Sequence, residues 1–239
     1  MRLFRDVADV AMDLNGIEAL NLNTLGSADT VTVGDLTGTD LTKANIDLSA
    51  VPGSGTGDGA ADTVTVDGTD GADQVDVSPA GGGILVSGLS TDVQVTGAEA
   101  TNDSIDVNTL GGDDTINSGL GISGPGAVNV DGGTGNDTAI YSGTPFDDTI
   151  GIGSLNGGVA AFGTTGTPFV VTSAVENLDV RGLAGDDTIT GSNGIAGLTH
   201  LTIDGGAGDD TLRGGDGDDT LIGGPGSDSV AAAAEATWR

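Results

Sequence analysis

Apolar and polar residues alternate in short runs along most of the chain. Segments such as TVTV at 63–66 and QVDV at 74–77 place a valine at every second position. A period of two is typical of half-buried β-strands, and the glycines and aspartates that bound each run favour turns. Helical periodicity is nearly absent, with residues 6–16 and 231–236 as the only candidates, and 6–16 suits a strand equally. The pattern predicts an all-β fold of short strands.

Two stretches without the usual turn motif, residues 81–97 and 156–175, are predicted to form strand–turn–strand extensions. Between them and around them the chain repeats itself. The longest repeated block occurs as EALNLNTLGSADTV (18–31), DSIDVNTLGGDDTI (103–116) and ENLDVRGLAGDDTI (176–189). Its copies align three leucines and three turn-ending aspartates: Leu25, Leu110 and Leu183, and Asp29, Asp114 and Asp187.

Self-similarity at this period indicates a stacked repeat architecture, in which each unit packs only on its neighbours. We therefore expect one continuous elongated domain built from about three copies of one module. Its expected parts are an incomplete first module (1–66), a second module (67–141), a third module (142–204), a nonapeptide segment (205–231) and a tail (232–239).

Composition narrows the class of partner. The chain has 45 glycines, 36 acidic residues against six Lys and Arg, and a net charge of −30. Of the acids 32 are Asp and four are Glu, a bias that favours short carboxylates placed in tight turns. No basic stripe is available for nucleic acid, no run is long enough to span a membrane, and there is no cysteine. Cations are the expected partners, and the regular strand pattern argues against the alternative of a disordered acidic chain.

The last third carries three consecutive nonapeptides: GGAGDDTLR (205–213), GGDGDDTLI (214–222) and GGPGSDSVA (223–231). Each fits G-G-x-G-x-D-x-U-x, where U is a large apolar residue, and the segment resembles the RTX, or hemolysin-type, calcium-binding repeat family. The resemblance implies a right-handed parallel β-solenoid (β-roll), with irregular coils upstream and regular nonapeptide coils at the C-terminus. In such a roll six residues make a turn and three make a strand, so turns on one edge recur every 18 residues.

The resemblance also implies the metal ligands. Calcium takes six to eight oxygens in flexible geometry, which glycine-rich turns and their aspartates can supply. Asp210 and Asp228 lie 18 residues apart and are expected to share one ion. The backbone carbonyls that would assist them belong to Gly206, Gly208, Gly224 and Gly226.

Other aspartates give weaker candidates. Asp219 falls on the opposite edge, with Asp204 or water left as its second ligand. Asp137 and Asp187 end equivalent turns upstream, but their spacing breaks the 18-residue rule, which predicts irregular sites. A turn-capping role is favoured over metal binding for a further set of aspartates: Asp29, Asp62, Asp73, Asp114 and Asp148.

The favoured function is calcium binding by a secreted or surface module whose folding depends on calcium. The alternative is a structural β-solenoid segment of an extracellular adhesin, sheath or filament in which calcium is dispensable. The resemblance implies an extracellular or cell-surface location, in a bacterium, and open solenoid ends would allow self-association or assembly into a larger extracellular structure. Enzymatic activity is not expected, because the only histidine, His200, lies in an alternating strand pattern and the acids fall in repeated turns.

Overall fold

The computed structural model describes residues 16–155, 157–164, 168–195 and 200–231. The predicted all-β class is confirmed, because every regular element in these residues is a strand. They contain no helix that could cross a membrane. The two candidate helical segments, 6–16 and 231–236, fall almost wholly outside the described residues, as do the tail and Trp238. The strands are β1 (Ala19–Asn23), β2 (Thr30–Val33), β3 (Lys43–Asp47), β4 (Thr63–Asp67), β5 (Gln74–Ala80), β6 (Gly83–Ser87), β7 (Asp92–Thr96), β8 (Ser104–Asn108), β9 (Thr115–Gly119), β10 (Ala127–Asp131), β11 (Thr138–Ser142), β12 (Thr149–Leu155), β13 (Gly158–Gly163), β14 (Phe169–Ser173), β15 (Asn177–Ala184), β16 (Thr188–Gly191), β17 (His200–Ala207), β18 (Thr211–Arg213), β19 (Thr220–Ile222) and β20 (Ser229–Ala231).

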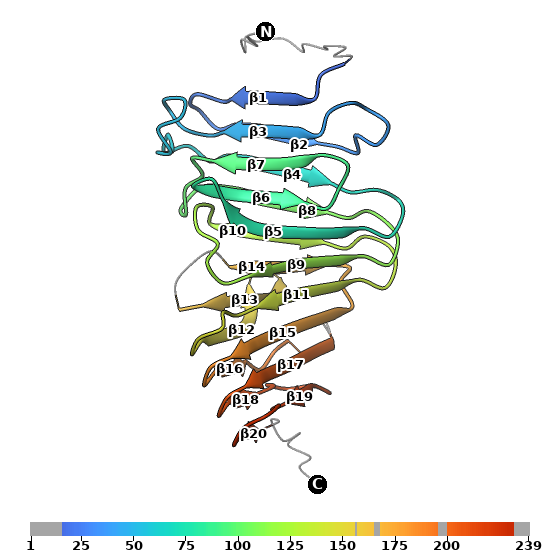
Figure 1. Ribbon diagram of the computed structural model, residues 1–239, viewed down its shortest axis with the longest axis vertical. Helices are drawn as coiled ribbons and strands as arrows, with labels where there is room; N and C mark the ends of the chain where they lie inside the picture. The colour runs from blue at the N-terminus through green and yellow to red at the C-terminus, as the bar shows by residue number, and fades with distance from the viewer. Residues whose placement is uncertain (1–15, 156, 165–167, 196–199, 232–239) are drawn as a thin grey trace.

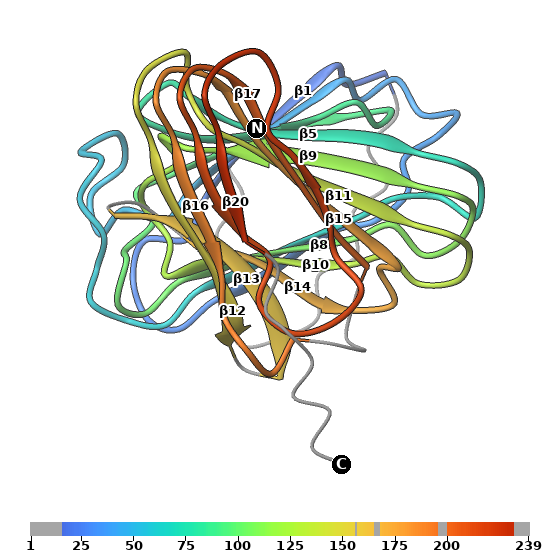
Figure 2. The ribbon, with the colours of Figure 1, turned by 90° about the horizontal axis from the view of Figure 1, so that it is seen from below.

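The strands form two sheets of ten, consistent with a β-roll (Figure 1). One sheet has the order β1-β3-β7-β6-β5-β9-β11-β15-β17-β19, and the other β2-β4-β8-β10-β14-β13-β12-β16-β18-β20. Most neighbours pair in parallel, because the chain passes through the opposite sheet before it returns. Seen along the stack, the strands lie in two layers that turns join at the sides (Figure 2).

Each sheet contains one antiparallel excursion, at the two stretches predicted to form strand–turn–strand extensions. In the first sheet β6 pairs antiparallel with β5 and β7, and in the second β13 pairs antiparallel with β12 and β14. The two excursions begin 75 residues apart, at Gln74 and Thr149. Between β5 and β12 the chain changes sheet five times, an odd number, so equivalent parts of the repeat fall in opposite sheets.

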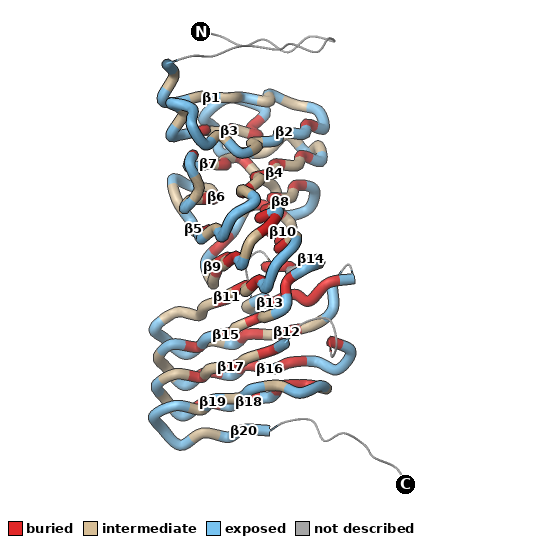
Figure 3. The backbone as a smooth tube through the Cα atoms, turned by 90° about the vertical axis from the view of Figure 1, so that its right-hand side faces the viewer, coloured by how far each residue is buried: buried red, intermediate tan, exposed pale blue. Residues whose placement is uncertain are grey.

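The core lies between the two sheets and is thin. Along most strands buried residues alternate with partly exposed ones, as the period of two predicts (Figure 3). The buried residues are mainly Val, Ile, Leu and Ala, which suit a narrow interior. Two buried aromatic rings, Tyr141 and Phe169, stack with centroids 6.1 Å apart, and burial raises the pKa of Tyr141 to about 12.

Candidate metal sites in the turns

The turn-ending aspartates of neighbouring turns are joined in a hydrogen-bonded ladder. The Asp187 N–H donates to Asp210 Oδ1 at 2.8 Å, and the Asp210 N–H donates to Asp228 Oδ1 at 3.1 Å. Upstream, the Asp148 N–H donates to Asp187 Oδ1 at 2.7 Å in the same manner. Each aspartate therefore accepts from the turn before it and donates to the turn after it, and the expected juxtaposition of Asp210 with Asp228 is present.

The spacing of these aspartates varies, but their geometry does not. Asp210 and Asp228 are 18 residues apart, whereas Asp187 and Asp210 are 23 apart and Asp148 and Asp187 are 39 apart. The expectation that unequal spacing makes Asp187 irregular was wrong. The additional residues lie elsewhere along the path, in the connection between β16 and β17 and in the β13–β14 excursion, so the turns still stack in register.

A second ladder, which the sequence analysis missed, runs one residue earlier in each turn and in the opposite direction. The Asp209 N–H donates to Asp186 Oδ1 at 2.9 Å, and the Ser227 N–H donates to Asp209 Oδ1 at 2.8 Å. The Asp186 N–H likewise donates to Asp147 Oδ1 at 2.9 Å. Because the two ladders run in opposite directions, each of two adjacent turns both donates an N–H to a carboxylate of the other and accepts one from it.

The first glycine of each motif makes room for the aspartate of the same turn. A Cβ atom added to Gly205 would collide with the Asp210 carboxylate, and the same holds for Gly214 with Asp219. Each aspartate thus folds back over the start of its own turn, and Oδ2 is the oxygen that faces inward.

The predicted carbonyl donors lie where adjacent turns touch. Gly224 has φ 97° and sits against the Gly206 carbonyl oxygen, and Gly226 has φ 156° and sits against the Gly208 carbonyl oxygen. A side chain at either position would meet both the unfavourable φ and the neighbouring backbone. The carbonyl oxygens of Gly206 and Gly208 therefore face Gly224 and Gly226 of the next turn.

The inward oxygens of several turn aspartates are buried and have no hydrogen-bond partner. This is true of Oδ2 in Asp187 and Asp210, each 1% exposed, and in Asp219. Burial raises the pKa of Asp187, and the charges of Asp210, Asp148 and Asp147 raise it further, against the Asp148 N–H bond. A buried carboxylate oxygen without a partner is costly, and a cation is the partner that such oxygens lack.

Other turns satisfy the same oxygen internally. The N–H of Thr69 donates to Asp73 Oδ2 at 2.7 Å, with its hydroxyl also in reach, and Thr144 bonds to Asp148 Oδ2 in the same way. The capping role expected of Asp73 and Asp148 is thus confirmed. In both turns the donor stands four residues before the aspartate.

In the turns with an unpartnered oxygen, the residue at that fourth position has positive φ. It is Gly206 (φ 97°) before Asp210 and Leu183 (φ 83°) before Asp187. In this conformation the N–H does not reach the carboxylate, which leaves Oδ2 open. The turns therefore form two classes, capped and open, and one backbone angle separates them.

The family model of the RTX calcium-binding nonapeptide repeat (4 copies) matches residues 179–194 and 202–230. These two segments are RTX repeats. RTX repeats bind Ca2+, and the matched residues include the open turns that end in Asp187, Asp210 and Asp219, and the last turn, which ends in Asp228. No curated protein matches the chain.

The RTX turn ending in Asp219 lies in the other row of turns, as predicted. Asp219 precedes β19 in the opposite sheet from β18 and β20, and the charges of Asp216 and Asp218 add to the burial that raises its pKa. Asp204 does not lie beside it. Asp204 pairs with Ile222, the last residue of β19 and three residues beyond Asp219, so the structure does not bring Asp204 to Asp219, and water is the other predicted second ligand.

Side chains alone cannot hold a metal in the described residues, since no three of His, Cys, Asp or Glu converge as ligands there. An ion in the RTX turns would therefore need backbone carbonyl oxygens in addition to carboxylates, which are ligands that calcium accepts readily. The donor set of paired Asp oxygens and glycine carbonyls fits calcium.

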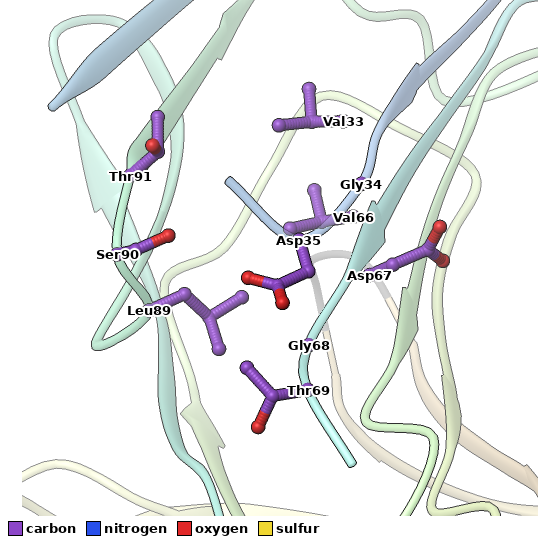
Figure 4. Close-up of a pocket in the computed structure, with 10 residues that line it drawn as sticks. All are labelled: Val33, Gly34, Asp35, Val66, Asp67, Gly68, Thr69, Leu89, Ser90 and Thr91. Carbon is purple, nitrogen blue, oxygen red and sulfur yellow. The ribbon is translucent and has the colours of Figure 1, made fainter. Parts of the chain in front are cut away.

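A small pocket near the N-terminal end lies apart from the RTX turns (Figure 4). Asp35, Leu89 and Thr69 turn into it, while the Asp67 carboxylate points away. The Asp35 carboxylate accepts the Thr37 N–H at 2.8 Å, and Asp67 accepts from Asn108 at 3.0 Å. The lining of this pocket offers no pair of groups suited to acid–base catalysis.

His200 lies elsewhere in the fold. It is exposed at the start of β17 and is a strand residue, as predicted.

Proposed function

We propose that this protein binds calcium between adjacent RTX turns and that calcium completes its folding. In the row before the second sheet, one ion lies between the turns of Asp210 and Asp228, with carbonyl oxygens of Gly206, Gly208, Gly224 and Gly226. A second ion lies between the turns of Asp187 and Asp210. Asp219 contributes to a site in the opposite row, where its turn packs on Gly191–Gly194.

The observation that carries this proposal is the buried, unpartnered Oδ2 atom at consecutive turns. Without a cation, two carboxylates on neighbouring strands, about 4.8 Å apart, repel each other inside the protein. A divalent ion changes that repulsion into attraction and supplies the missing partner. The metal-free turns are therefore the least stable part of the fold.

The proposal extends to the architecture of the whole chain and to its location. We take the two sheets to be the faces of a right-handed solenoid, with irregular coils in the modules at 1–66, 67–141 and 142–204, regular coils at 205–231, and a tail at 232–239. RTX proteins are typically secreted, and calcium sites of millimolar affinity suit an extracellular or cell-surface location. We place the protein there, exported in a form that folds when calcium becomes available.

The structural alternative, an adhesin, sheath or filament segment with dispensable calcium, is less well supported. It would leave the inward oxygens without partners, whereas the capped turns show that the chain can satisfy such oxygens with Thr69 or Thr144. Self-association through the ends of the stack, where β1, β2, β19 and β20 are the outermost strands of the sheets, is compatible with either function.

The test is far-UV circular dichroism of the chelator-treated protein during titration with calcium, with magnesium as the control ion. A cooperative gain of β-sheet signal with calcium alone is expected. The double variant Asp210→Asn with Asp228→Asn should shift the midpoint to higher calcium. The control Asp179→Asn, which removes a partly exposed charge paired with Arg181, should leave the midpoint unchanged. A full β-sheet signal in chelator, unchanged by calcium, would overturn calcium-dependent folding.

A further inference from the structure

We propose a further calcium site outside the RTX match, between the turn that ends in Asp114 and the turn that ends in Asp137. Both turns precede strands of the first sheet, β9 and β11, which pair directly. The matched residues begin at 179, so nothing in the repeat match assigns a role to this pair. The proposal rests on the calcium binding proposed for the RTX turns, because it extends the same chemistry to a second place.

The backbone contacts of this pair reproduce those of the RTX pair that ends in Asp187 and Asp210. In both pairs the two aspartates are 23 residues apart, and the first donates its N–H to Oδ1 of the second at 2.8 Å. The other shared bonds are Gly112 N–H to Thr134 O at 2.9 Å and Asn136 N–H to Asp113 Oδ1 at 3.0 Å, matching Gly185 N–H to Ala207 O at 2.9 Å and Asp209 N–H to Asp186 Oδ1 at 2.9 Å.

The carbonyl oxygens are placed in the same way. Gly133 sits against the Leu110 carbonyl oxygen and Gly135 against the Gly112 carbonyl oxygen. In the RTX pair the corresponding contacts are those of Gly206 with Leu183 and Gly208 with Gly185. Every backbone group that the RTX pair directs between its turns thus has a counterpart here.

The carboxylates themselves point to a ligand. Asp114 is 1% exposed and Asp137 is 0% exposed, and Oδ2 of each has no hydrogen-bond partner. The residues four positions earlier, Leu110 with φ 67° and Gly133 with φ 83°, have the positive φ of the open class. Two fully buried, unpartnered oxygens on adjacent turns are the donor arrangement of the RTX pair.

The surrounding charge is negative, and within the part of the chain that the structure describes no ion pair reaches this turn. The Asp137 N–H donates to Glu176 Oε2 at 2.8 Å, which brings a further carboxylate to the same turn. The neighbouring strand β15 carries Arg181, but that residue pairs with Ser142 at the far end of β11 and bonds to Asp179. A bound cation would neutralise this turn while its carboxylates stay ionised.

Neighbouring turns provide built-in controls. Asp73, whose N–H donates to Asp114 Oδ1 at 2.8 Å, belongs to the capped class through Thr69. The proposed site therefore ends at Asp114 and does not extend to Asp73. The Asp114 turn has Thr109 and Leu110 at the positions of the two leading glycines of the nonapeptide, whereas the matched Asp187 turn keeps the first of them as Gly182.

The experiment counts calcium ions per chain by equilibrium dialysis on the full-length protein, with magnesium as background. In Asp114→Asn with Asp137→Asn, each side chain keeps an oxygen for the ladder and loses the charge, and one ion fewer than in the parent is expected. Asp73→Asn and the strand-surface control Asp106→Asn should bind as many ions as the parent. An unchanged count in the double variant overturns the inference.

Two further variants distinguish failure of this inference from failure of the proposed function and from misfolding of the double variant. Asp210→Asn with Asp228→Asn should remove RTX ions and leave the upstream ion; a parent that binds no calcium refutes the proposed function as well as this inference. If Asp114→Asn with Asp137→Asn loses its β-sheet signal, the calcium count is repeated on the single variant Leu110→Thr. Leu110 is 44% exposed, and a β-branched residue disfavours positive φ, which moves the turn toward the capped class. Loss of one ion in that variant supports the site, and an unchanged count refutes it.

Discussion

The substitution Asp187→Asn should change protein stability in opposite directions with and without calcium. Asparagine keeps an oxygen that can accept the Asp148 N–H, now 2.7 Å from Asp187 Oδ1, and it removes the buried charge. The unpartnered Oδ2 is replaced by an amide nitrogen, which cannot bind a metal ion. The variant therefore separates the structural role of this residue from its role as a ligand.

The magnitude follows from the spacing of the turns. Two unit charges about 4.8 Å apart repel by about 3.5 kcal/mol at an effective dielectric of about 20, and by about 0.9 kcal/mol in bulk water. Removing the Asp187 charge relieves a repulsion in this range, while the bond to a neutral acceptor is weaker by about 1 kcal/mol. In chelator we expect a gain of about 0 to 2 kcal/mol in the free energy of unfolding.

In calcium the same substitution should lower the free energy of unfolding. A site at a hundredfold excess of ion over Kd contributes about 2.7 kcal/mol, which the variant loses for each ion that Asp187 binds. For a chain of this size the loss corresponds to a decrease of about 5 to 10 °C in Tm. The assay is thermal and urea unfolding of parent and variant, each in chelator and in saturating calcium.

The control is Asp148→Asn, which disturbs an oxygen already capped by Thr144 and should lower stability equally in both conditions. If Asp187→Asn also lowers stability by the same amount with and without calcium, Asp187 is a hydrogen-bonding residue of the ladder and not a ligand.

Two further predictions concern the turn glycine and pH. Gly205→Ala would force the Asp210 carboxylate away from its ladder partner, so urea unfolding in calcium should show a loss of about 2 to 4 kcal/mol. The control Gly71→Ala should change the free energy of unfolding by no more than about 1 kcal/mol, since a Cβ atom there would have Thr69 Oγ1 at 3.7 Å as its nearest neighbour. Equal losses in the two variants would contradict the predicted clash at Gly205. The pKa values of three turn aspartates (Asp137, Asp187 and Asp219) are raised, mainly by burial and then by neighbouring acids, above their ordinary value of 3.8. Because their folded-state pKa lies above the unfolded value, the ionised form is disfavoured in the fold, and stability in chelator should fall as pH rises from 3.8 through the raised values. Calcium should reverse that trend. The measurement is the urea concentration at the midpoint of unfolding in chelator, and a midpoint that increases over this pH range would contradict the prediction.

The strands, the two excursions and the 18-residue register were predictable because they follow from local patterns. A period of two marks a strand wherever it lies, and a fixed nonapeptide length sets the pairing of Thr211 with Ser229 and of Thr202 with Thr220. The exchange of sheets between β5 and β12 was not predictable from the repeat alone. It depends on how many times the chain crosses between the two sheets from one copy to the next, and not on the number of residues.

The candidate site was predictable in its chemistry and only partly in its extent. Counting residues joined Asp210 to Asp228, but it wrongly treated Asp187 as irregular and wrongly offered Asp204 to Asp219. Residues inserted between β16 and β17 leave the stacking of turns unchanged, so sequence distance is a poor measure of distance between turns. The aligned leucines were the available signal for the upstream pair, and their meaning became clear only from the sign of φ.

The open turns combine two unfavourable features that the capped turns avoid. Leu183 and Leu110 hold positive φ, which costs a non-glycine residue about 1 to 2 kcal/mol, and each leaves a buried carboxylate oxygen unpartnered at about 1 to 3 kcal/mol. Thr144 avoids both costs in a turn that otherwise has the same ladder. A calcium ion at high occupancy contributes a free energy of the same size as these costs, about 2.7 kcal/mol per site. The open turns are thus unfavourable without calcium and close to balance with it, and for this reason the sign of φ four residues before each aspartate should indicate where calcium is coupled to folding.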